Sequence, residues 1–82
     1  MVLEPGMLAR SKAGHDKNCI YVIISVNDEY VYLADGSKRS VCHPKRKNRK
    51  HVQAITCLRS GSVADDKSVR EAINSFVNKQ MQ

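Results

Sequence analysis

Residues 6–25, GMLARSKAGHDKNCIYVIIS, decide the fold of this chain. A short run at 7–12 and a β-branched apolar run at 19–26 flank a polar loop at 13–18. β-Branched and aromatic residues suit a strand better than a helix, because their side chains are stiff at χ1 and pack well on a pleated surface. The stretch therefore predicts a strand, a tight loop and a second, central strand.

The loop has the residues that a tight turn requires. Gly14 and Asn18 tolerate a positive φ angle, and the carboxylate of Asp16 can accept a backbone N–H and hold the turn closed. His15 and Lys17 lie at the tip of this loop. The loop is therefore predicted to be preshaped, with a polar tip.

A third strand is predicted at 29–34, after an Asn27-Asp28 turn in which both residues accept left-handed conformations. Successive side chains of a strand point to opposite faces. Val31 and Leu33 should therefore form its buried face.

The segment after Asp35-Gly36 predicts two more strands. The Asp-Gly pair is a hairpin turn signal that leads into a strand at 37–43, which Pro44 ends because it has no N–H to donate. A basic loop at 43–51 follows, and an alternating pattern at 51–58 predicts a fifth strand. Five short strands joined by tight turns indicate a small, strongly bent antiparallel sheet or barrel.

The C-terminal part of the chain predicts one amphipathic helix at 65–80, after a linker at 59–64. Its apolar residues fall on one helical stripe: Val69, Ala72, Ile73, Phe76 and Val77. Asp65, Asp66 or Ser68 can cap its first turn. The stripe can cover an open side of the barrel, which is the ordinary result for a small chain, or it can dock into a groove of a protein partner.

Charge is concentrated in the middle of the chain. The 82 residues carry a net charge of +6, and residues 37–59 hold eight basic residues and no acidic one. Such a block requires full solvation or a polyanionic partner, and a phosphate backbone is the commonest polyanion. Residues 1–5 are expected to form a short arm with no secretion signal, and no apolar run is long enough for a membrane span. The sequence therefore predicts a cytosolic protein without a membrane partner.

The cysteine pattern argues against a disulfide framework and against a metal site. Three cysteines without Cys-x-x-Cys spacing suit a reducing compartment, where they are expected to be buried as small apolar residues. The candidate metal ligands are Cys19, Cys42, His43, His51 and Cys57. Their spacing is not that of a zinc ribbon or finger. No metal and no other cofactor is predicted.

Catalysis is not expected either. Turn chemistry already explains Asp16, Asp28 and Asp35, and no serine or cysteine has a recognisable base partner. A chain of this length has little room for a water-excluding pocket. The sequence is interpreted as that of a non-enzyme.

Five segments together resemble the KOW motif: residues 6–18, 21–23, 34–36, 44–47 and 50–52. The chain is similar to small bacterial KOW-domain RNA-binding proteins, which are themselves similar to a group of archaeal and eukaryotic large-subunit ribosomal proteins. The resemblance implies an SH3-like barrel over 6–58 that contacts RNA through its loops and basic edge. Asn18 stands where the motif has a glycine, and asparagine is the best non-glycine residue for a left-handed position.

The predicted RNA-binding residues are Lys12, His15, Lys17, Lys38, Arg39, Lys45, Arg46, Lys47, Arg49, Lys50 and His51. The predicted turn residues are Gly14, Asp16, Asn18, Asp35 and Gly36. Arginines can grip two phosphate oxygens at once, whereas lysines act as mobile point charges. Tyr30 and Tyr32 can stack on exposed bases, although cross-strand packing is the commoner role of such tyrosines.

The predicted function is binding of structured RNA, ribosomal RNA included, by a monomeric ribosome-associated or ribosomal-protein-like factor. The alternative is a protein-interaction module of the transcription or translation apparatus, whose partner is a ribosomal or transcription-apparatus protein. In that case the basic run only adjusts solubility or orientation.

Overall fold

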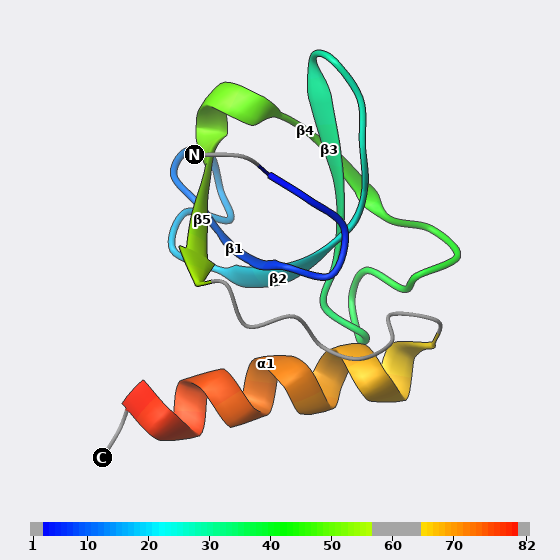
Figure 1. The fold of residues 1–82 in the computed structure, drawn as a ribbon, viewed down its shortest axis with the longest axis vertical. Coiled ribbons are helices and arrows are strands. Elements are labelled where there is room, and N and C mark those ends of the chain that lie inside the picture. The colour runs from blue at the N-terminus through cyan, green and yellow to red at the C-terminus, as the bar shows by residue number, and fades with distance from the viewer. Residues whose placement is uncertain (1–2, 57–64, 81–82) are drawn as a thin grey trace.

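A computed structural model describes residues 3–56 and 65–80 of the chain. In these residues the chain forms five strands, one 3-10 helix and one α-helix, drawn in Figure 1. They are β1 (Leu8–Ser11), β2 (Ile20–Val26), β3 (Tyr30–Ala34), β4 (Lys45–Asn48), η1 (Arg49–His51), β5 (Val52–Thr56) and α1 (Asp66–Gln80). The predicted fold class is confirmed: the protein is mainly β, with an antiparallel SH3-like barrel followed by a C-terminal helix.

The five described strands form a single antiparallel sheet in the order β4-β3-β2-β1-β5. The pairing register shifts between Leu8 and Ala9 of β1 and between Ile23 and Ser25 of β2. Such irregularities bend a strand and increase its twist. They allow this short sheet to curl, with η1 connecting the two edge strands β4 and β5 (Figure 1).

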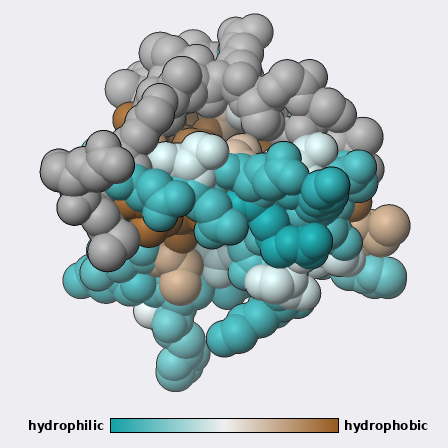
Figure 2. Space-filling model, turned by 90° about the horizontal axis from the view of Figure 1, so that it is seen from below, coloured by the Kyte–Doolittle hydropathy of each residue, from teal (hydrophilic) through white to brown (hydrophobic). Residues whose placement is uncertain are grey.

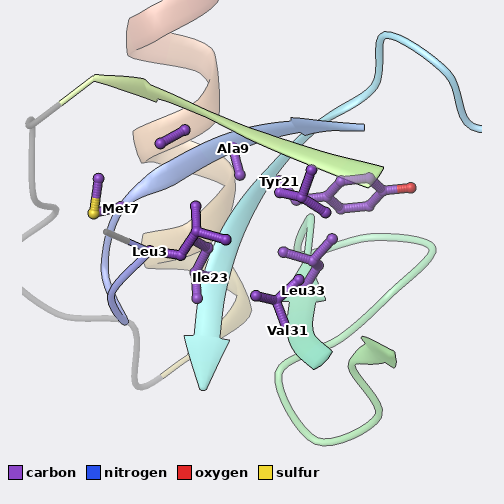
Figure 3. Packing of buried hydrophobic residues seen from close by; sticks show 9 residues of the cluster. Leu3, Met7, Ala9, Tyr21, Ile23, Val31 and Leu33 are labelled. Atoms are coloured by element: carbon purple, nitrogen blue, oxygen red, sulfur yellow. The ribbon is translucent and has the colours of Figure 1, made fainter. Parts of the chain in front are cut away.

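The apolar run of β2 is buried on both faces of the sheet. Tyr21 and Ile23 point into the barrel, where they pack with Val31 and Leu33 of β3 (Figure 3). Val22 points the other way and is fully buried in a second cluster. The predicted orientation of β3 is confirmed, because Val31 and Leu33 are both 0% exposed.

The second cluster lies between the sheet and α1. Val69 of α1 is fully buried against Leu8, Val22 and Ala34, and Phe76 packs at the margin of this cluster. Figure 1 shows α1 lying below β1 and β2, on the outside of the barrel, and in Figure 2, which looks from that side, the described residues at the surface are mainly hydrophilic. The apolar stripe of α1 therefore faces the sheet over most of its length, and Val77 is its exposed end.

Polar contacts fix the first turn of α1. The Asp65 carboxylate accepts a hydrogen bond from the Ser68 N–H at 2.8 Å, so Asp65 is the N-cap, and this bond holds the pKa of the Asp65 carboxyl below its usual value. Asp66 accepts from the Val41 N–H at 2.8 Å. A Cβ atom on Gly36, whose φ is +80°, would lie 2.5 Å from the Asp66 carbonyl oxygen. Close packing and a positive φ both require glycine at this position.

The predicted strand at 37–43 is wrong, and the basic segment that was predicted as a loop instead contains β4 and η1. The Asp35 carboxylate accepts from the N–H groups of Ser37 and Arg39, and Asp66 takes that of Val41. These backbone donors are therefore used in a turn and a helix contact instead of a ladder. Pro44 was predicted to end the strand at 37–43, but in the structure it directly precedes β4.

Three smaller expectations also need correction. Asn27 and Asp28 do not adopt positive φ; the Asn27 side chain closes their turn by accepting from the Glu29 and Tyr30 N–H groups at 2.9 and 2.7 Å. Cys19 and Cys42 are exposed free thiols, because both lie in connections outside the strands. Within the predicted arm, Leu3 is buried in the barrel core.

Two other predictions lie outside the described residues. They are the role of Cys57 and the linker at 59–64.

Candidate nucleic-acid interface

The structure divides the predicted RNA-binding residues into two groups. Lys45, Lys47 and Arg49 are partly buried. The others are exposed, namely Lys12, His15, Lys17, Lys38, Arg39, Arg46, Lys50 and His51. The exposed group is the one most fully presented to solvent.

Lys45 and Lys47 of β4 converge on Asp16 in the loop between β1 and β2. The Nζ atoms of Lys45 and Lys47 lie 2.9 and 3.0 Å from the two carboxylate oxygens of Asp16. Lys47 also donates to the Ala13 carbonyl oxygen at 3.0 Å. Both lysines lie on the inner face of β4, since they pair across the ladder with Leu33 and Val31. Their charges therefore hold β4 to the loop.

Two further side chains donate to the same carboxylate. Ser11, which is fully buried, donates to Oδ1 at 2.9 Å, and the Tyr21 hydroxyl donates to Oδ2 at 3.0 Å. In Figure 3 this hydroxyl points away from the other labelled core residues. Burial alone would raise the pKa of Asp16, but the four hydrogen bonds outweigh it and hold that pKa well below its usual value. Burial and the bond to Asp16 raise the pKa of Tyr21.

The predicted turn residues take the expected conformations at this loop, but Asp16 has a larger role than predicted. Gly14 and Asn18 have φ angles of +86° and +75°. The hydrogen bonds to the Asp16 carboxylate come from side chains, whereas the turn itself is closed by backbone bonds such as that from the Asn18 N–H to the Ser11 carbonyl oxygen, at 2.8 Å. We call Asp16, Ser11, Tyr21, Lys45 and Lys47 the Asp16 cluster.

The outer face of β3 and β4 combines tyrosines with arginines. The Arg46 guanidinium lies over the Tyr30 ring, 4.7 Å from its centroid, and Arg46 pairs with Tyr32 across the ladder. Arg49 donates from its guanidinium to the Asn27 carbonyl oxygen at 2.7 Å. Tyr30 and Tyr32 are half-buried. This face therefore presents tyrosine rings and guanidinium planes, the two kinds of planar group on which nucleic-acid bases can stack.

More cations lie in the connection between β3 and β4. Lys38 and Arg39 are exposed cations of this connection, which lies beside β4 in Figure 1, and His43 is exposed there as well. Asp35, the nearest acidic residue in sequence, is occupied by the turn bonds described above. The nearest carboxylate in sequence is therefore not free to pair with Lys38 or Arg39.

Neither a metal centre nor a membrane span is found in the part of the chain that the structure describes. Within 3–56 and 65–80, no three His, Cys, Asp or Glu side chains come together as metal ligands would. No helix among these residues is long and apolar enough to cross a membrane.

Sequence reasoning missed the partners of Asp16. Ser11 and Tyr21 lie in the strands on either side of the loop, whereas the two lysines lie about 30 residues further along the chain, and only folding brings all four side chains to Asp16. One signal was present: Lys45 and Lys47 are two residues apart, which places both on one face if the segment is a strand. Interpreting the segment as a loop removed that signal.

Comparison of the chain with known proteins gives no family. No protein-family model matches it, and no curated protein matches it.

Proposed function

We propose that the protein binds RNA through the surface formed by β4, the outer face of β3, the 37–44 connection and η1, which we call the basic face. One observation carries the proposal. Residues 37–56 contain seven basic and no acidic side chains, and four of these cations are exposed on a compact barrel: Lys38, Arg39, Arg46 and Lys50. Phosphate contacts by such cations supply most of the non-specific affinity for nucleic acid.

Protection of a sheet edge accounts for only part of this charge. β4 is an edge strand, and lysines on edge strands prevent pairing with other chains. Lys38, Arg39 and Lys50 lie outside β4, so they do not protect this edge against pairing with other chains. A polyanionic ligand accounts for the cations on and off the strand together.

The tyrosines favour RNA with unpaired bases over a regular duplex. Single-stranded segments are bound by stacking their bases on aromatic side chains or on arginine planes. Tyr30, Tyr32 and Arg46 provide such planes side by side on one face. The resemblance to KOW proteins makes structured ribosomal RNA the first candidate ligand and a ribosome-associated role in the cytosol the first candidate context.

Charge reversal that spares the Asp16 cluster tests this proposal. The variant carries Lys38→Glu, Arg39→Glu, Arg46→Glu and Lys50→Glu, whereas Lys45 and Lys47 are kept because their loss would disturb the fold. The control preserves charge at the same sites with Lys38→Arg, Arg39→Lys, Arg46→Lys and Lys50→Arg. Fluorescence anisotropy with a ribosomal RNA fragment, an unrelated hairpin and duplex DNA of equal length, over a series of salt concentrations, measures the affinities.

We expect the reversal variant to lose about 100-fold or more in RNA affinity at physiological salt, and the control to stay within a few-fold of the parent. A preference for one RNA that persists at high salt would show recognition beyond charge. Unchanged RNA binding by a reversal variant with a native circular dichroism spectrum would disprove the proposal. The protein-interaction alternative would then be the one to pursue.

A further inference from the structure

A groove at an open end of the barrel shares Arg49 and Lys50 with the basic face but adds an apolar lining. It has a volume of about 420 Å³, within the roughly 300–1,000 Å³ range of small-molecule sites. Its lining residues come from the N-terminal segment, the end of β1, η1 and β5: Leu3, Lys12, Arg49, Lys50, Val52, Gln53 and Ala54. We call it the mouth groove.

The groove has an apolar floor and a cationic rim. Leu3, Val52 and Ala54 are 8, 7 and 7% exposed, so they form a floor whose atoms are mostly covered. Lys12 and Lys50 are exposed, and none of the lining residues that the structure describes is acidic. An apolar surface beside exposed cations is complementary to a molecule with an apolar plane and an anionic group.

Backbone contacts hold the two sides of the groove together. The Lys12 N–H donates to the His51 carbonyl oxygen at 2.8 Å, and Ser11 pairs with Val52 across the ladder between β1 and β5. Asn48 caps η1 by accepting from the Lys50 N–H at 2.9 Å. The backbone positions from which the cations project around the floor are therefore fixed.

Arg49 and Gln53 supply directional groups. The Arg49 guanidinium is anchored by its bond to the Asn27 carbonyl oxygen and has further N–H donors that a phosphate oxygen can accept from. Gln53 is exposed, and its amide can both donate and accept. The guanidinium group can bind a phosphate, and the amide group can bind the edge of a base.

We propose that the mouth groove holds one unpaired nucleotide of a single-stranded or looped RNA, with its phosphate among Lys12, Arg49 and Lys50 and its base on the floor formed by Leu3, Val52 and Ala54. This inference rests on the proposed RNA-binding function and names the element that the RNA must present. A duplex cannot supply it, because its bases are stacked and paired. The basic face attracts the strand, and the mouth groove selects an extruded nucleotide.

The first test maps the occupant on the intact protein by NMR. Isotope-labelled protein is titrated with uridine monophosphate, with adenosine monophosphate and with inorganic phosphate. We expect saturable shifts at the amides of Lys12, Lys50, Gln53 and Ala54 with the nucleotides, and shifts only near the cations with phosphate. Nucleotide-induced shifts confined to Tyr30 and Arg46, or no saturable shifts at all, would overturn the inference.

The second test measures strand preference. The variant Lys12→Ala with Lys50→Ala is compared with a charge-matched control outside the groove, Lys38→Ala with Arg39→Ala. A short single-stranded RNA and the duplex of the same length are the probes. We expect the groove variant to lose roughly tenfold in affinity for the single strand, with a salt slope smaller by about 1.4 for two lost contacts, and a smaller share of its affinity for the duplex, because Lys50 also belongs to the basic face. The control should weaken binding to both probes alike.

The outcomes separate this inference from the proposed function. A parent protein that binds RNA, together with a groove variant that keeps its preference for the single strand, would overturn the groove and leave the basic face intact. A parent protein that binds no RNA would overturn both. Mononucleotide binding in the groove without RNA binding would overturn RNA as the occupant.

Discussion

β2 and β4 are strands of the same sheet with opposite chemistry. β2 is IYVIISV, and its residues enter two apolar clusters, one inside the barrel and one under α1. β4 is KRKN and contains no apolar residue. Burial of apolar side chains on both faces stabilises β2 as a strand. By contrast, β4 is held in the sheet by its backbone pairing with β3 and by the ion pairs of its two lysines with Asp16.

The comparison shows why the cations of β4 are not equivalent. Lys45 and Lys47 face inward, where a half-buried ammonium group requires a partner, and Asp16 supplies it. Arg46, between them, faces outward over Tyr30. Because side chains alternate along this short strand, two of its cations stabilise the fold, and the third is exposed to solvent.

The largest loss of stability is expected for a substitution in β2. Ile23→Ala removes a side chain that is 0% exposed at the centre of the barrel cluster. The lost burial and the resulting cavity should lower the free energy of unfolding by about 3–4 kcal/mol. Urea unfolding followed by circular dichroism measures this, and Ile24→Ala, at a half-buried position, is the milder control. Equal losses for both variants would contradict the assigned core.

The second effect is expected at the charged strand. Asp16→Asn leaves two lysines without their counter-ion and should lower the free energy of unfolding by about 2–3 kcal/mol, somewhat below the cost for a fully buried pair because Lys45 is 27% exposed. Asp28→Asn, at an exposed position, should change it by less than about 0.5 kcal/mol. If the two variants were equally stable, the Asp16 cluster would not be what holds β4.

The dependence of stability on pH provides a further test of the Asp16 cluster. The folded pKa of Asp16 lies below its unfolded value of about 3.9, so its contribution is present above that pH and is lost as the pH falls below it. Between about pH 5 and pH 2 the parent should lose more stability than Asp16→Asn, and the difference between them should shrink. A constant difference over this range would show that the Asp16 carboxylate does not act through its charge.

A smaller effect is expected on the outer face of β2. Phe76→Ala removes a half-buried ring from the contact between α1 and the sheet and should cost about 1–2 kcal/mol, roughly half the value of a fully buried phenylalanine. That loss would lower the melting temperature by roughly 4–16 °C in a domain of this size. Lost partner binding with unchanged melting would instead identify the stripe as a docking surface.

The smallest effect is expected in the loop that bears Asp16, and it has the opposite sign. Asn18 has a φ of +75°, which costs an L-residue free energy that glycine does not lose. Asn18→Gly should stabilise the protein by about 0.5 kcal/mol, after the greater entropy of glycine in the unfolded chain is subtracted. Thermal unfolding beside Asn74→Gly, at an exposed position inside α1 where glycine should destabilise, measures the sign.

Residues whose neighbours are local in sequence were predicted well. The period-two pattern of 29–34 placed Val31 and Leu33 inside, and the helical stripe around Val69 indicated α1. The strand at 37–43 and the loop after it were predicted wrongly, because the two halves of 37–48 have similar polar composition and differ mainly in their partners. Asp35 and Asp66 keep the first half out of the sheet, and β3 takes up the second half.

The sequence by itself determined a small mainly β domain with a C-terminal helix, positive φ at Gly14 and Asn18, and a basic segment without a carboxylate. These follow from side-chain periodicity, backbone sterics and composition, which act over a few residues. Only the tertiary structure decided that Lys45 and Lys47 bind Asp16, that Arg46 lies over Tyr30, and that Lys12 and Lys50 flank one groove. Each of these contacts joins distant parts of the chain, and the ladder register that brings them together depends on the whole sheet.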